Sequence, residues 1–228
     1  MKTTYLTLAG MLLASNAFAV VGHDTSARTS DAVAVSDPDY VVIDEDWWVP
    51  LRMEPSDALN DAREYYRRDN ERAAADEIRK AASWVSYASM HALPHTKQAL
   101  LSARTGLLTL ADDLETGKVR GAARMDATLA DASHALAQWH YYRARDEYGK
   151  HDSITASRDL EAAAANLENA ARSAHLQFGP DTITVFEDIY EGGRTLTKER
   201  TIDNDVLGMH LDGIKKAIDT MADALTRS

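Results

Sequence analysis

The chain has 228 residues, with 36 acidic against 25 basic side chains and no cysteine. Its net charge of −11 argues against nucleic acid or an anionic membrane surface as a partner, because both attract basic proteins. The lack of cysteine excludes disulfides and haem attachment through Cys-x-x-Cys-His, although a chain of this length can bury a core without such links.

The first residues have the composition of a signal peptide. Lys2 precedes an apolar run from Tyr5 to Ala14, which is too short to span a bilayer. The small residues of Ala17-Phe18-Ala19 predict cleavage after Ala19, leaving 24 basic and 36 acidic residues and a net charge of −12. No later segment approaches about 18 consecutive apolar residues. We therefore expect a periplasmic or secreted protein with no membrane span after cleavage.

The next segment changes character twice. Residues 20–39 lack any hydrophobic period and predict a flexible leader. The β-branched and aromatic run from Tyr40 to Ile43 predicts a short strand. Trp47 and Trp48 follow, in a stretch that we expect to be irregular.

From residue 55 onward, apolar side chains recur at spacings of three and four, which predicts about six helices. Asp69-Asn70 separates the first two, and Pro94 opens the third. Asp152 or Ser153 is expected to cap the fifth helix, and Asp203 the sixth. The predicted fold is therefore mainly α, with packed helical hairpins forming a bundle over residues 40–228.

The period changes between the fifth and sixth helices. Residues 182–186 alternate polar and apolar side chains, and Gly192-Gly193 is followed by another β-prone run. Two such runs around a glycine pair predict a β-hairpin over about 182–200.

A weak internal repeat has an offset of 82. Residues 62–85 align with residues 144–167, and both stretches follow the same plan of a helix, a short polar break and a helix. This pattern predicts two duplicated halves, at about 55–115 and 119–176.

Aromatic and basic residues concentrate in one stretch of the fourth helix, Trp139-His140-Tyr141-Tyr142-Arg143. Bulky rings in a row cover most of a helix circumference, so some of them must pack against neighbouring helices. The others, with Trp47 and Trp48, form a candidate partner or ligand surface, because Trp, Tyr and Arg dominate such sites.

A second hypothesis is a metal- or cofactor-binding bundle. Asp131 and His134 lie three residues apart on one predicted helix, which is half of a di-iron carboxylate pattern, but no Glu-x-x-His motif accompanies them. The chain also lacks a Gly-x-Ser-x-Gly elbow and a glycine-rich phosphate loop. We therefore predict no catalytic residues, no cofactor and no enzyme activity.

Part of the chain resembles the YfdX-type proteins, a family of small exported helical proteins. The resemblance covers roughly residues 39–110 and rests on three segments: Asp39 to Asp44, residues 68–81 around Arg68-Asp69-Asn70-Glu71, and Leu93 to Leu100. It implies a periplasmic, oligomerising protein tied to acid or envelope stress, which binds small molecules or assists chaperones. Trp47-Trp48 and the predicted glycine hairpin depart from the family pattern.

These observations predict a non-catalytic, stress-associated periplasmic protein that self-associates and binds proteins or small molecules through helical surfaces. Protonation of all eight histidines would change the net charge from −12 to −4. We therefore expect mild acid to weaken self-repulsion and alter association.

Overall fold

A computed structural model describes the backbone of residues 45–119, 121–199 and 203–227, and the side chains of residues 53–119, 121–194 and 203–227. The predicted signal peptide, the leader and the predicted strand at 40–43 lie outside these ranges. The described part contains seven helices and no strand: α1 Glu45–Arg67, α2 Glu71–Met90, α3 Pro94–Glu115, α4 Ala122–Gly149, α5 Ser153–Ser173, α6 Pro180–Glu199 and α7 Asn204–Leu225. The mainly α prediction is confirmed, with one helix more than expected.

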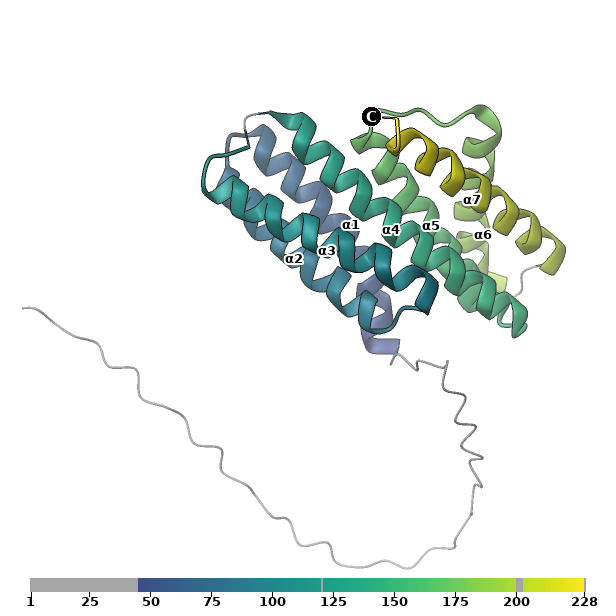
Figure 1. The fold of residues 1–228 in the computed structure, drawn as a ribbon. Coiled ribbons are helices and arrows are strands. Elements are labelled where there is room, and N and C mark those ends of the chain that lie inside the picture. The colour runs from purple at the N-terminus through teal and green to yellow at the C-terminus, as the bar shows by residue number, and fades with distance from the viewer. Residues whose placement is uncertain (1–44, 120, 200–202, 228) are drawn as a thin grey trace, which may run out of the picture. The chain divides into compact units, whose positions relative to one another are not determined.

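The long helix α4 belongs to two hydrophobic clusters. In Figure 1, α2 and α3 lie on one side of α4, and α6 and α7 lie on the other. The first cluster joins α1, α2 and α3 to the first part of α4 through side chains such as Leu107 and Leu136. The second joins the last part of α4 to α5, α6 and α7 through Leu160, Phe186 and Ile214. The core is thus divided, and α4 connects its two parts.

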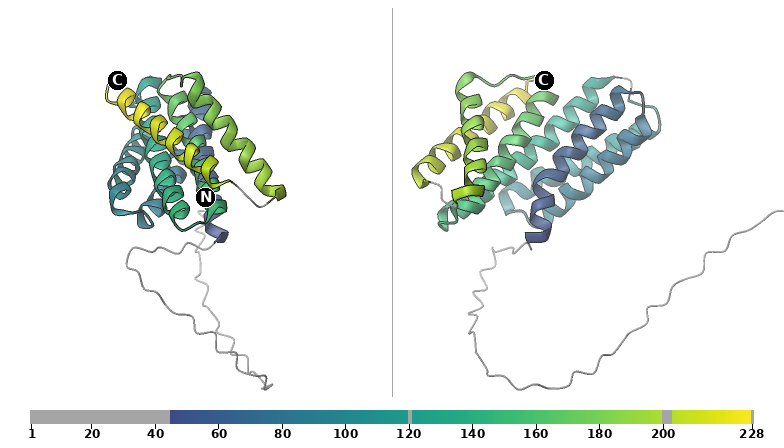
Figure 2. Two further views of the ribbon diagram at one scale, coloured as in Figure 1. Left: turned by 90° about the vertical axis from the view of Figure 1, so that its right-hand side faces the viewer. Right: turned by 180° about the vertical axis from the view of Figure 1, so that it is seen from behind.

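Helix α1 also packs alongside α5, as the view from behind in Figure 2 shows. The Ser56 hydroxyl donates to the Asn166 side chain, and the Arg63 guanidinium donates to the Ser173 hydroxyl. Both pairs are 110 residues apart, so the two helices run in the same direction. This contact brings α1, the first of the described helices, against α5.

Three helix boundaries follow the sequence signals. Asp152 caps α5 by accepting from the Thr155 N–H, and Asp203 caps α7 by accepting from the Asp205 N–H. Pro94 stands in the first turn of α3, where a missing N–H costs nothing. These three predictions are confirmed.

The β-hairpin predicted over 182–200 is wrong, because these residues lie in α6. Val185, Phe186 and Ile189 pack in the second cluster, and their spacing of one, then three, is that of a helix face. The apparent polar–apolar alternation of Thr182 to Phe186 was too short to decide between the two periods. Gly192 and Gly193 are helical residues, and a Cβ at Gly193 would approach the Glu161 carboxylate to 3.0 Å. The glycine therefore allows a close approach of α6 to α5.

The turn between α1 and α2 has the same backbone geometry as the turn between α4 and α5. Asp69 and His151, which are separated by the repeat offset of 82, both adopt a left-handed conformation, with φ of 57° and 64°. Gly117 and His175 end α3 and α5 in the same way. Because this ending recurs outside the proposed repeat, the duplication stays a prediction.

Alanine is expected to have opposite effects at two helical glycines. A Cβ at Gly106 in α3 would lie 3.6 Å from the Thr128 methyl, which is ordinary contact, so G106A should stabilise the fold by about 0.5–1 kcal/mol. A Cβ at Gly213 in α7 would lie 2.7 Å and 2.9 Å from the two methyl groups of Val185. Overpacking against a stiff β-branched side chain should outweigh the gain in propensity and destabilise G213A by about 1 kcal/mol.

Urea denaturation followed by circular dichroism measures both glycine variants. In the V185A background the same G213A change should no longer destabilise the fold, since the methyl groups that clash are removed. Equal stabilisation by both single alanines would contradict the close packing of α6 on α7.

Candidate functional site

The aromatic and basic stretch of α4 lies where this helix passes from the first cluster to the second. Trp139 packs in the first cluster and Tyr141 in the second, and His140 between them is fully buried. Tyr142 and Arg143 are half-buried. As expected for bulky residues in a row, successive side chains contact different neighbours. Three of the five predicted surface residues on α4 are therefore core residues in this structure.

A buried polar junction, which we call the His140 junction, joins α4 to α5. Nδ1 of His140 lies 3.0 Å from Oδ1 of Asp159, and both side chains are 0% exposed. Nε of Arg143 lies 3.7 Å from the other oxygen of Asp159. Since a carboxylate can only accept, Nδ1 of His140 is the donor. A buried carboxylate needs such partners, because its desolvation is costly.

The accessible part of the stretch combines rings and cations. The ring of His95, from the first turn of α3, lies edge-on to the Tyr142 ring at a centroid distance of 4.2 Å. The Arg145 guanidinium lies over the same tyrosine ring at 4.9 Å. Burial, and secondly the charge of Arg143, lower the pKa of His91. Trp47 and Trp48 lie in α1, not in an irregular segment, and their side chains are outside the described set.

A second polar junction, which we call the Arg63 junction, was missed by the sequence reasoning. Arg63 lies 3.3 Å from Asp126 of α4 and donates to Ser173 of α5, and its side chain is 8% exposed. Nε2 of His175 lies 3.3 Å from the other oxygen of Asp126. The signal was present: Arg63 interrupts the apolar stripe of α1, between Leu59 and Tyr66 at helical spacings.

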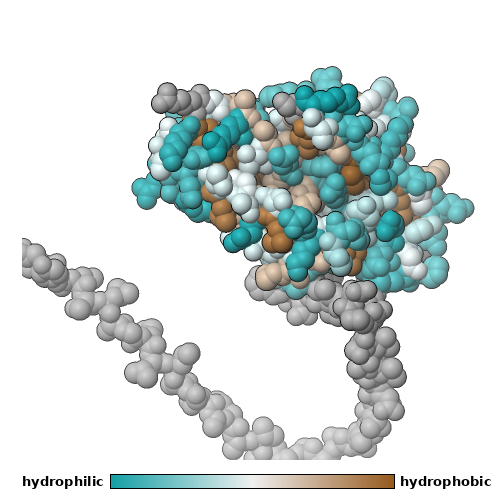
Figure 3. All heavy atoms as spheres, in the orientation of Figure 1, coloured by the Kyte–Doolittle hydropathy of each residue, from teal (hydrophilic) through white to brown (hydrophobic). Residues whose placement is uncertain are grey.

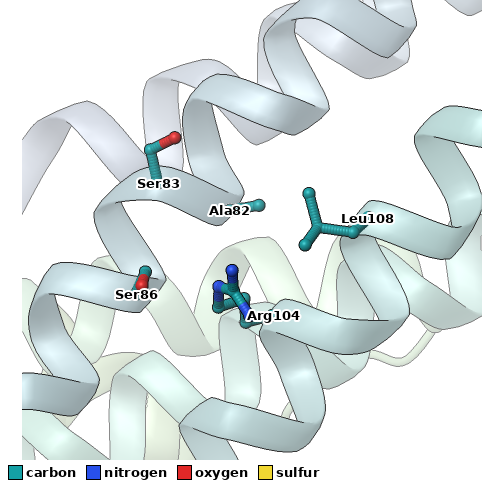
Figure 4. A pocket seen from close by; sticks show the side chains of 5 residues that line it. All are labelled: Ala82, Ser83, Ser86, Arg104 and Leu108. Atoms are coloured by element: carbon teal, nitrogen blue, oxygen red, sulfur yellow. The ribbon is translucent and has the colours of Figure 1, made fainter.

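Pockets open at the surface between neighbouring helices of the described bundle. A small one of about 210 Å³ lies between α2 and α3, lined by Ala82, Ser83, Ser86, Arg104 and Leu108 (Figure 4). A larger one of about 320 Å³ lies between α3 and α4. Small side chains of α3 form one wall of this α3–α4 pocket, and α4 contributes the polar side chains of Thr128, Asp131, His134 and Gln138. The structure therefore places the two residues of the metal hypothesis in one pocket.

His134 is held by α7. Its Nε2 lies 3.1 Å from the Ile218 carbonyl oxygen and must donate to it, so Nδ1 is the acceptor of the neutral ring. Burial lowers the pKa of His134, whereas burial raises the pKa of Asp131. Within the described residues, no group of three or more His, Asp or Glu side chains is arranged to hold a metal ion.

Large apolar side chains reach the surface only singly among the residues whose side chains are described. Met53, Met90, Leu101, Ile183 and Met209 are exposed, and they lie on five different helices. The face shown in Figure 3 has apolar residues scattered among hydrophilic ones. Such isolated side chains are ordinary on soluble proteins and define no docking face.

Fold and site together define, over the described residues, a helical bundle with the His140 and Arg63 junctions and with pockets between α2 and α3 and between α3 and α4. None of the helices described here combines the length and the apolar character that a bilayer span requires. Comparisons with protein-family models, curated proteins and solved structures found no match for this chain. The resemblance to YfdX-type proteins therefore stays a prediction.

Mild acid is expected to destabilise the fold. Burial lowers the pKa of both His134 and His210 below the usual value of about 6.5, so the unfolded chain takes up these protons first. The contribution of the two neutral histidines to the free energy of unfolding is complete above pH 6.5. It is lost as the pH falls from 6.5 toward the pKa values that His134 and His210 have in the folded protein. Asp131 acts in the opposite direction, because burial raises its pKa, but only at the lower pH where carboxyls titrate.

Urea titrations between pH 7.5 and 5.5 measure this histidine effect. The double variant H134Q/H210Q should show a shallower loss of unfolding free energy across that range than the parent chain. An equal slope in both proteins would mean that these two histidines do not carry the pH dependence.

Proposed function

We propose that the protein is a non-catalytic, stress-associated periplasmic protein that self-associates and binds proteins or small molecules through its helical surfaces. The supporting observation is where its polar groups lie. In the His140 junction, where a histidine meets a carboxylate most closely among the described residues, the His140 and Asp159 side chains are both 0% exposed. The accessible features of the described part of the chain include the α2–α3 pocket, the α3–α4 pocket and the ring-and-cation surface around Tyr142. Such features suit recognition rather than bond-making.

The periplasmic location rests on the predicted signal peptide, and the link to stress rests on the resemblance to YfdX-type proteins. The charge of −12 after cleavage weakens self-association at neutral pH without preventing it, and it favours cationic partners. The change in net charge expected in mild acid is smaller than the sequence alone suggests, because burial opposes protonation of His91, His134 and His210. Less charge is therefore neutralised in mild acid than eight free histidines would allow.

The surface around Tyr142 is the first candidate for contacts with other molecules. Tyr142 is half-buried between His95 and Arg145, so part of its ring is accessible beside an imidazole ring and a guanidinium group. Tyrosine and arginine are the residues that contribute most to interface energies. A Y142A/R145A variant removes this surface while leaving the buried Trp139 and His140 unchanged.

Native protein prepared from the periplasm without a tag tests the proposal. Light scattering at pH 7.5 and 5.5 should give a particle mass above that of a monomer, and mass spectrometry should identify molecules that co-purify. The Y142A/R145A variant should lose most of this association, and the exposed α6 variant R194A should not. A monomer that carries no partner at either pH would contradict the proposal.

Metal binding is the alternative function, and the same preparation tests it. Asp131 and His134 share a pocket, which is the observation that keeps this hypothesis. A stoichiometric transition metal in the tag-free protein, lost in the D131N/H134Q variant, would support the alternative over the proposed function.

A further inference from the structure

The α3–α4 pocket has an asymmetric composition. Its α3 wall is made of small residues, the apolar Ala99, Ala103 and Gly106 together with Ser102, and it carries no charge. Its α4 wall carries one carboxylate, Asp131, and the polar side chains of Thr128, His134 and Gln138. No lysine or arginine lines it. A ligand in this pocket would meet a negative, polar wall on one side and an uncharged wall of small, mostly apolar residues on the other.

Asp131 supplies a charge that the protein itself does not neutralise. Within the described residues, it forms no ion pair and no hydrogen bond, although most arginines of the bundle are paired with acids. It is an exposed residue, but the pocket walls displace part of the water around its carboxyl, which raises its pKa. A carboxylate that is partly dehydrated and lacks a partner favours a cation.

The neighbouring groups on α4 are fixed as acceptors. Nε2 of His134 donates to the Ile218 carbonyl, which leaves Nδ1 with a lone pair. The Thr128 hydroxyl donates to the Arg124 carbonyl, so its oxygen can only accept from a ligand. The pocket therefore offers acceptors on two adjacent turns of α4, next to the carboxylate. A cation that carries several N–H donors would match them better than a bare ion.

We propose that this pocket binds a small primary ammonium compound, with its ammonium group on Asp131, Thr128 and His134 and its short hydrocarbon part on the α3 wall. A volume of about 320 Å³ is at the small end of the range for ligand sites, so the ligand is compact. A divalent metal fits less well, because no third acidic or histidine ligand is present within the described residues. The inference rests on the proposed function and specifies a ligand class for one of its surfaces.

An NMR titration of the isotope-labelled protein with n-butylammonium at pH 7.5 and low salt tests the inference. The expected result is a saturable shift of signals from Asp131, His134 and Gln138. The neutral analogue n-butanol and the anion butyrate should produce no saturable shift, because they lack the charge that Asp131 recognises. Loss of one charge-assisted hydrogen bond should weaken binding of n-butylammonium by D131N about tenfold or more.

Two control variants separate the site from general electrostatics and from folding. E187Q removes the same charge from the exposed face of α6 and should bind n-butylammonium as the parent chain does. G106L fills the pocket from the α3 wall, where a Cβ has room, and should abolish binding while Asp131 stays in place. Equal affinity in the parent chain and D131N, or no saturable binding in the parent chain, would overturn the assignment.

The proposed function and this inference can fail separately. A periplasmic preparation that associates and retains partners, but shows no n-butylammonium binding, would overturn the pocket assignment alone. Binding of n-butylammonium that depends on Asp131, in a protein that is monomeric and carries no protein partner, would support the pocket and contradict the self-association.

Discussion

Replacing Asp159 by alanine is expected to lower the free energy of unfolding by about 3–5 kcal/mol, which is the usual cost of breaking a buried pair. Asp159 is 0% exposed and accepts from Nδ1 of His140, while Arg143 lies 3.7 Å from its second oxygen. The variant D159A removes the carboxylate on which both side chains converge and leaves a cavity between α4 and α5. Urea denaturation at pH 7.5, followed by circular dichroism, measures the loss.

Two further variants show whether charge or packing is responsible for the loss in D159A. D159N keeps the shape and an oxygen acceptor for His140, so it should lose less than D159A. D146A removes an exposed acid of α4 that pairs only with Lys150, and it should change stability by less than about 0.5 kcal/mol. A loss below about 1 kcal/mol in D159A would mean that the His140 junction contributes little to the fold.

The helices of this chain could be predicted because their apolar stripes are long. Leu100, Ala103, Leu107, Leu110 and Leu114 repeat over four turns of α3, and all five are buried. Helix α6 was mistaken for a hairpin because its apolar face is shorter and β-branched residues surround it. A glycine pair indicates a turn only when no neighbouring helix requires close approach, and Gly193 packs against Glu161. Local sequence does not contain that information.

The polar junctions were less accessible to sequence reasoning. His140 could be singled out within its row of rings, but its partner lies 19 residues away on the next helix. Which acid meets it depends on the register between α4 and α5, which the whole core determines. The α3–α4 pocket depends in the same way on two helices. Asp131 and His134 could be named as neighbours on one helix face, whereas the apolar wall opposite them could not.

The variant R63A is expected to lower the free energy of unfolding by about 3 kcal/mol. The reason is that the Asp126 carboxylate, which is only 14% exposed, would lose its main partner. Arg63 connects α1 to α4 through Asp126 and to α5 through Ser173. Burial lowers the pKa of the Arg63 guanidinium, and the Asp126 charge opposes that shift. The attraction between Arg63 and Asp126 is therefore opposed by the desolvation of the Arg63 guanidinium.

A double-mutant cycle on Arg63 and Asp126, measured by urea denaturation, separates that cost from the attraction between the two charges. If the attraction only offsets desolvation, R63M/D126M should be more stable than either single variant, since methionine fills both positions without leaving a buried charge. Its stability should approach that of the parent chain, reduced by the lost contact of His175 with Asp126. Losses in R63M and D126M that simply add would show that the two side chains act independently, and that their ion pair does not help to hold α1 against α4.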